Sequence, residues 1–417
     1  MSLEKNRPNE QYITVAAPFG SSQTGVRVIH SDIRAKVKKA YGRRDGNWGD
    51  LPIFQGDYIN FGYWAAISQR IKFTREDRIK SSAALYKYVI DALRISKNDT
   101  VLELGCGRAV GMLDTIEYID LKTLIGVDIT PAQIWRAKRK KTIRETNHLQ
   151  ENLSTKKLVQ DLDNLESQVE LYSRNNKAQK EELEQELEAL NQQILEQENK
   201  PNIRIETRIE LLTANLQRAT NFELYKKDER KELQEKKHAY IQNMETKKKI
   251  VEKIQSIKLY AKPAESTELK AHSVDKIYSV EVFQHIEDFN PLAVEINRIL
   301  VPGGKLSFCA HLATNYSSYD KLREENLLLD EIEVLRPIDE VIGTFNHNGF
   351  DVNCHTIGEH VFGSYDKYVT EANPFDELSR KIYNSYNSGY IDYYVCVMEK
   401  VKATGNTFHE HEEHDEL

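Results

Sequence analysis

A short apolar strand that ends in a glycine turn constrains the fold of this chain most strongly. The apolar residues of 101–104 stop at Gly105-Cys106-Gly107, and apolar residues at helical spacing follow from 110 to 116. A second apolar run, 124–127, ends at Asp128. The order strand, glycine turn, helix, strand and acid predicts the first half of a nucleotide-binding βαβ unit.

The chemistry of this stretch favours a nucleoside ligand with a positive centre. Glycines let the backbone approach a ligand closely, and a helix start presents unpaired amide donors. The carboxylate of Asp128 can accept hydrogen bonds from both ribose hydroxyls. A dinucleotide fingerprint would need a third glycine close by to hold a pyrophosphate. Here Glu103 enters the turn instead, and a carboxylate suits a cationic group better than a pyrophosphate.

Four motifs in order along the chain resemble those of class I S-adenosylmethionine-dependent methyltransferases. VLELGCG and the following GVD-x-T are similar to the first two motifs, and Ser279-Val280-Glu281 with His285 and then LVPGGKL are similar to the later ones. Upstream, Asn60-Phe61-Gly62-Tyr63-Trp64 resembles the N-terminal lid of the branch that methylates small molecules and lipids, such as tocopherol, ubiquinone and sterols. The resemblance covers residues 60–140 and 255–312 well, and residues 340–400 loosely. It implies an α/β fold with a Rossmann-like, seven-stranded methyltransferase sheet.

The same resemblance implies S-adenosylmethionine as cofactor and assigns residues to it. Glu103 would hold the methionine ammonium group, directly or through water. The turn Gly105-Cys106-Gly107 would line the methionine and ribose, and Asp128 would bind the ribose hydroxyls. Ile129 would pack on adenine, and Glu281 would face the same cleft. Tyr63 and Trp64 would shield the sulfonium as part of the lid.

Adenine recognition departs from the family pattern. The family's acid after the third strand falls on Pro263, which cannot accept a hydrogen bond from the adenine amino group through a side chain. Backbone groups around Ala264, or the side chain of Glu265, are therefore expected to replace it.

Two residues at the end of the fourth predicted strand are candidate catalytic groups. Methyl transfer is an in-line displacement at a cationic sulfur, so a base is needed only when the accepting atom carries a proton. His285 has a side chain whose pKa lies near neutrality, and Glu281 leaves the same strand end. The alternatives are that His285 is a structural residue bonded to a loop backbone and that Glu281 caps the following helix.

Residues 147–255 interrupt the family pattern between the second and third strands. This stretch is rich in Glu, Lys, Gln and Leu, with apolar residues at three- and four-residue steps and its one proline, Pro201, near the middle. The pattern predicts two helices of about 50 residues, each about 75 Å long, folded back as an antiparallel coiled coil. The alternative is disordered charged sequence. Such a hairpin would associate with a second copy, giving a homodimer, or dock a protein partner.

Composition limits the partners and the setting. The net charge of -7 argues against a nucleic-acid-binding surface over the whole protein, though not against a local basic patch. No apolar run approaches the roughly 20 residues of a transmembrane helix, and the chain does not start as a signal peptide does. The four cysteines, without a C-x-x-C pair, predict reduced thiols and a cytoplasmic protein. No metal site is predicted.

Five segments follow from these patterns. Residues 1–50 are expected to be an extended or partly ordered arm. Residues 51–146 are expected to form the first part of the methyltransferase domain and to include the aromatic lid. The alternative for the lid is a satellite hydrophobic cluster. The coiled-coil hairpin at 147–255 precedes the second part, 256–400, which carries the substrate cap. The acidic tail, 401–417, is expected to be disordered; its final HDEL matches a retrieval signal of the endoplasmic reticulum, which without an entry signal is interpreted as chance.

The predicted function is methyl transfer from S-adenosylmethionine to a small-molecule or lipid acceptor. A degenerate, non-catalytic methyltransferase fold that presents the coiled coil to a protein is the competing hypothesis, favoured by Pro263 and by Ala109 where relatives often have glycine. A third is methylation of a protein or nucleic acid guided by the hairpin.

Overall fold

The chain divides into two compact units, and each is described by itself. The computed structural model describes residues 31–42, 51, 53–67, 72–174, 227–327, 332–372 and 376–401. The first unit comprises Met1–Ile143 and Lys253–Leu417, and the second comprises Arg144–Glu252.

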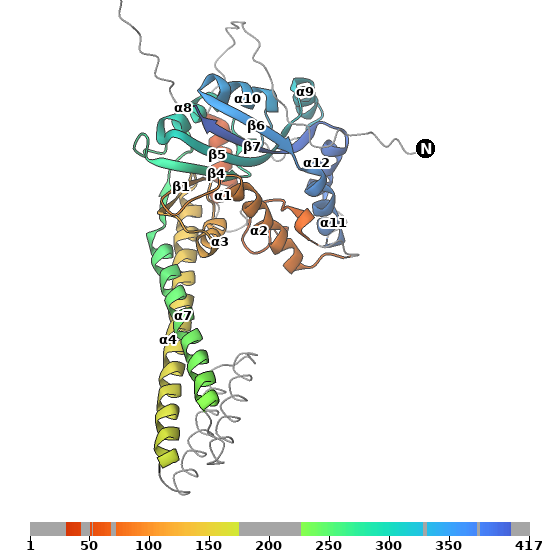
Figure 1. Ribbon diagram of the computed structural model, residues 1–417. Coiled ribbons are helices and arrows are strands. Elements are labelled where there is room, and N and C mark those ends of the chain that lie inside the picture. The colour runs from red at the N-terminus through yellow and green to blue at the C-terminus, as the bar shows by residue number, and fades with distance from the viewer. Residues whose placement is uncertain are drawn as a thin grey trace, which may run out of the picture. The chain divides into compact units, whose positions relative to one another are not determined.

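A seven-stranded sheet in the order β3-β2-β1-β4-β5-β7-β6 forms the centre of the first unit (Figure 1). The parallel strands are β1 (Thr100–Leu104), β2 (Thr123–Asp128), β3 (Lys258–Ala261), β4 (Val274–Val280) and β5 (Leu300–Ala313). β7 (Ile391–Lys400) is antiparallel to β5 and to the edge strand β6 (Phe350–Thr356). The predicted seven-stranded α/β sheet is confirmed. Because the strand order reverses between β1 and β4, the crevice between their carboxyl ends is where such sheets bind ligands.

Helices cover both faces of this sheet, as Figure 1 shows for α2 and α3 on one side and α8 and α10 on the other. α2 (Arg75–Asp91) begins with a capping box between Thr74 and Asp77, and α3 (Val110–Tyr118) follows β1. α8 (Phe289–Ile299) and α10 (Ile338–His347) bury their apolar stripes in the main core. There Phe283 stacks on Phe308 with ring centroids 3.7 Å apart. The remaining helices are α9 (Tyr316–Glu324), α11 (Phe362–Ala372) and α12 (Glu377–Asn387).

The N-terminal arm contains a helix that the sequence analysis did not predict. Residues Ser31–Gly42 form α1, so this part of the arm, which was expected to be extended or partly ordered, is helical. Ile33, Val37 and Tyr41 repeat at four-residue spacing and place one apolar stripe along the helix. This stripe is too short to stand out among the surrounding lysines, yet it is sufficient to pack the helix against the rest of the unit.

The described part of the second unit comes from the long helices α4 (Pro131–Arg174) and α7 (Lys227–Ser256), whose residues 131–143 and 253–256 belong to the first unit. Lys247 is 2.5 Å from Glu151, and Lys237 pairs with Asp163. A step forward along α4 therefore corresponds to a step backward along α7, so the two helices run antiparallel, side by side as in Figure 1. The middle of the predicted hairpin, with Pro201, lies outside the described residues, and a coiled coil along its whole length stays a prediction. Neither these two helices nor any other described one combines the length and apolar character needed to cross a membrane.

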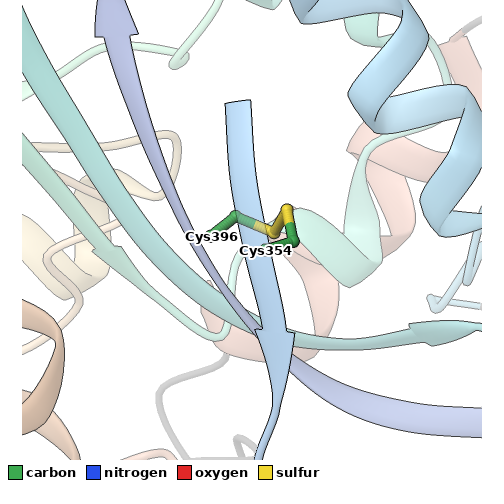
Figure 2. Close-up of a disulfide and its surroundings, with 2 residues drawn as sticks. All are labelled: Cys354 and Cys396. Atoms are coloured by element: carbon green, nitrogen blue, oxygen red, sulfur yellow. A yellow bond between two sulfur atoms is a disulfide. The ribbon is translucent and has the colours of Figure 1, made fainter. Parts of the chain in front are cut away.

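A disulfide joins Cys354 of β6 to Cys396 of β7 (Figure 2). The two residues are directly opposite in the antiparallel register, with Cα atoms 4.1 Å apart, and both are buried. Cys106 and Cys309 are free and buried. The expectation of four reduced cysteines is thus wrong for one pair. The two cysteines are separated by 42 positions in the sequence, and their pairing depends on a strand register that exists only in the folded sheet.

Gly62 is expected to be essential for docking the 57–67 segment onto α2. Its φ is +83°, and an added Cβ would collide with the Ser81 side chain and lie 3.1 Å from the Ser81 carbonyl carbon. Gly389 is the matched control, because its φ is +75° but an added Cβ meets nothing within 4 Å. Gly389→Ala should lower the free energy of unfolding by about 1–2 kcal/mol through backbone strain alone. Gly62→Ala should lose the same free energy of unfolding through strain and about 1–3 kcal/mol more through the steric clash. Urea titration of both variants measures the difference, and equal losses would contradict the packing argument.

Candidate active site

A cavity opens at the carboxyl ends of β1, β2 and β4. Its lining comes from separate parts of the first unit: α1, residues 57–59, the glycine turn 105–108, residues 128–133, residues 262–265 and residues 280–288. The cavity therefore lies at the switch point of the strand order, where the sequence placed the site.

The glycine turn and the end of β2 are tied together by Asp128. One oxygen, Oδ2, accepts the Gly107 N–H at 3.0 Å, and Oδ1 accepts the Thr130 N–H at 2.7 Å. Gly105 (φ +69°) lies against Val282, where an added Cβ would collide with the valine side chain. Burial raises the pKa of Asp128, although the two backbone donors oppose the shift. Together with Cys106 and Ile129, these predicted residues all line the cavity.

Gln133 is a lining residue that the sequence analysis missed. It lies in the first turn of α4, its exposed fraction is 1%, and neither its amide oxygen nor its amide nitrogen has a hydrogen-bond partner among the residues that the structure describes. A buried amide without partners is costly unless a ligand supplies them. The signal was present in the sequence, because a helix that begins at Pro131 turns its third residue toward the glycine turn.

Glu103 is not among the residues that line the cavity, so its predicted hold on the methionine ammonium group stays a prediction. Its side chain is buried within β1, where Tyr86 donates to Oε1 at 3.1 Å and Tyr278 donates to Oε2 at 2.9 Å. Burial raises the pKa of Glu103 to about 8, against the effect of the two tyrosine hydroxyls. Tyr86 itself lines the cavity, so Glu103 holds a residue of the wall.

Tyr63 and Trp64 are also absent from the cavity lining. Trp64 packs on Phe73 with ring centroids 4.8 Å apart, and Tyr63 packs on Tyr88 at 4.8 Å. These contacts match the alternative of a satellite hydrophobic cluster. In the same segment, residues 57–59 line the cavity instead.

A charged cluster forms one wall beside these residues. Arg108 donates to Asp57 Oδ1 at 2.6 Å, and Lys140 pairs with the other oxygen of the same carboxylate. These two cations keep the pKa of Asp57 low although burial opposes the ionised form. Sequence reasoning did not find this cluster, because its members come from three segments.

The segment after β3 also reaches the cavity. Ala264 and Glu265 line it as predicted, whereas Pro263 does not. Glu265 is 2.7 Å from Arg34 of α1, so this carboxylate fixes the N-terminal helix over the cavity. Its predicted contact with adenine would have to share the carboxylate with this ion pair.

Glu281 occupies the wall at the end of β4 in a left-handed backbone conformation (φ +55°), which is strained for a residue other than glycine. Its Oε1 accepts the Phe61 N–H at 2.6 Å and the Tyr393 hydroxyl at 2.7 Å. Burial raises the pKa of Glu281 to about 7, although His311, the Phe61 amide, Tyr393 and Arg78 favour the ionised form. The helix-cap alternative does not hold, because Asp288 caps α8.

His285 lines the cavity but both ring nitrogens face partners. Nδ1 is 3.0 Å from the Ile332 carbonyl oxygen and Nε2 is 3.4 Å from the Tyr41 hydroxyl. Burial lowers the pKa of His285, so the ring is neutral near pH 7. The arrangement matches the structural alternative for this histidine more closely than the role of a base.

Comparisons with known proteins agree with this geometry. A family model described as a methyltransferase domain matches residues 232–308, which include β3, β4 and α8. The structure of geranyl diphosphate C-methyltransferase from Streptomyces coelicolor A3(2), with a substrate analogue and S-adenosyl-L-homocysteine, has a TM-score of 0.53 at 11% identity, covering 89% of this chain and 99% of that one. A mycolic acid cyclopropane synthase, CmaA1, has a TM-score of 0.50 at 13% identity, covering 88% and 98%. No curated protein sequence matches the chain.

The resemblance predicted from the motifs is thereby confirmed. Residues 232–308 match a methyltransferase domain, and the first unit shares its fold with the solved methyltransferase.

Proposed function

We propose that this protein transfers a methyl group from S-adenosylmethionine to a small-molecule or lipid acceptor. The observation that carries the proposal is that Asp128 and Gln133, whose amide has no partner among the described residues, line the same cavity at the switch point of the sheet. A carboxylate and a side-chain amide can together bind the two hydroxyls of a ribose. The two similar solved enzymes, which act on geranyl diphosphate and mycolic acid, support the cofactor and an apolar acceptor.

The cavity residues would divide the binding as follows. Asp128 and Gln133 hold the ribose, and the glycine turn lets the backbone approach the methionine part without a side chain in the way. Ile129 packs on the base, and the 262–265 segment borders it. When bound, S-adenosylmethionine supplies an electrophilic methyl group on a positively charged sulfur.

Glu281 is positioned to act as the base for a protonated acceptor. Its Oε1 is fixed by two hydrogen bonds, and Oε2 accepts none from the described residues. The free oxygen can take the acceptor's proton while the new bond to the methyl carbon forms. A carboxylate whose pKa is about 7 is a better base near neutrality than an ordinary glutamate.

Calorimetry with S-adenosylmethionine tests the cofactor site. Gln133→Ala should weaken binding about 3- to 10-fold, the worth of a typical hydrogen bond, and Asp128→Asn more, because a charged acceptor is lost. Tyr63→Phe is the control, since Tyr63 lies outside the cavity lining, and it should bind as the wild type does. If the wild type does not bind at micromolar concentrations, the competing hypothesis of a non-catalytic scaffold replaces this one.

The pH dependence of methyl transfer tests Glu281. With tritiated S-adenosylmethionine and a lipid extract as acceptor, the rate should rise with pH and level off above about 7, because only the ionised carboxylate accepts a proton. Glu281→Gln should lower the rate at least about 100-fold. Tyr393→Phe should move the midpoint to higher pH, because it removes a donor that stabilises the ionised form. Tyr394→Phe, its neighbour without a bond to Glu281, is the control, and an identical shift there would exclude the assignment.

The helical hairpin is proposed to associate with a second copy or another protein. The antiparallel ion pairs of α4 and α7 support a regular rod, and rods of this kind expose surface for pairing. Light scattering of the intact chain and of a version with residues 147–255 replaced by a short linker should show a halved mass for the shortened form, after correction for the deletion. If both the intact and the shortened protein have the mass of one chain, self-association is excluded and docking to another protein remains as the hypothesis.

A further inference from the structure

The outer face of α1 carries exposed positive charge directly over the cavity. Ile33, Val37 and Tyr41 line the cavity from one side of the helix. On the opposite side, Lys38 and Lys39 are exposed and have no ion-pair partner among the described residues. This helix is therefore amphipathic, with an apolar inner face and a basic outer face.

The first turns of α4 also have a buried side and an exposed basic side. Gln133 and Ile134 are buried, whereas Lys138 and Arg139 are exposed and Trp135 has an exposed fraction of 61%. Arg139 lies over the Trp135 ring, 5.9 Å from its centroid. This end of α4 therefore presents an indole ring and basic side chains together to solvent.

The two helices lie next to each other at the cavity. Arg136 of α4 donates to the Tyr41 carbonyl of α1 at 3.2 Å, and both helices line the cavity. We call the exposed set the basic face; it comprises Lys38, Lys39, Trp135, Lys138 and Arg139. Residues 131–143 contain no acidic residue, although the whole chain has a net charge of -7. The positive charge is thus concentrated at this face.

We propose that the basic face docks the protein onto an anionic phospholipid bilayer. Lysine and arginine near such a surface are each attracted by about 1 kcal/mol, and a tryptophan beside them fits the headgroup region, where indole rings concentrate. Nucleic acid would also attract the lysines. The bilayer is favoured because the exposed indole and the apolar wall behind α1 match a surface with an apolar interior, which a phosphate backbone lacks.

Docking in this orientation would bring the cavity wall formed by α1 to the membrane. The apolar stripe of α1 separates the cavity from the basic face, so a small movement of this helix would join the cavity to the lipid phase. Binding of the basic face to a bilayer needs no cofactor, and it can be measured without methyl transfer.

Sedimentation with vesicles tests the docking surface. The intact chain should bind vesicles of phosphatidylcholine with 30% phosphatidylserine and not those of phosphatidylcholine alone, and salt should weaken the binding. The triple variant Lys38→Glu, Lys39→Glu, Lys138→Glu should bind at least about 100-fold more weakly, since each lysine contributes about fivefold. The matched control is Lys97→Glu, Lys122→Glu, Lys270→Glu, which makes the same charge change at exposed residues outside the basic face.

Trp135 supplies a second measurement. Its fluorescence should shift to shorter wavelength with anionic vesicles, and Trp135→Phe should lose this shift while retaining its salt-sensitive binding. Equal binding by the two triple variants, or equal binding to both vesicle types, overturns the proposal. Tighter binding to a duplex nucleic acid than to the vesicles would also overturn it and assign the basic face to that partner.

Discussion

The carboxylate of Asp128 is the interaction on which the site depends. It connects the end of β2, the glycine turn after β1 and the start of α4, because its two oxygens accept one backbone N–H from each of the latter two. A side chain that could not accept both bonds would leave buried amides unpaired. The same carboxylate faces the cavity, so the group that shapes the crevice is also the group proposed to bind the ribose.

The succession of strands along the chain and the place of the crevice could be predicted from the sequence because their signals are local. Buried parallel strands have nearly continuous apolar runs, and the glycine turn marks where one strand gives way to a helix. Asp128 and Glu281 each follow such a run directly, so their place at the strand ends follows from the chain itself. Four separate motifs in the expected order made the family resemblance strong despite the long insertion between them.

Side-chain direction could not be predicted in the same way. Glu103 precedes the glycine turn by two residues, yet the alternation of the strand points it to two tyrosines rather than the cavity. Tyr63 and Trp64 pack on aromatic residues of distant segments, and their contacts exist only after the chain has folded. The pairing of Cys354 with Cys396 likewise depends on a strand register and not on spacing.

Glu103 and Glu281 show how one sheet gives two buried acids different roles. Burial raises the pKa of both, to about 8 and about 7 respectively. Both oxygens of Glu103 accept tyrosine hydroxyls within the core, so its carboxyl group supports the cavity wall. Glu281 uses one oxygen for two donors, and its other oxygen accepts no hydrogen bond from the residues that the structure describes. Its strained backbone is held where the ends of β4 and β5 meet. Because an oxygen without a protein donor is more accessible to a ligand's proton than one that already accepts a tyrosine hydroxyl, the role of base is proposed for Glu281 and not for Glu103.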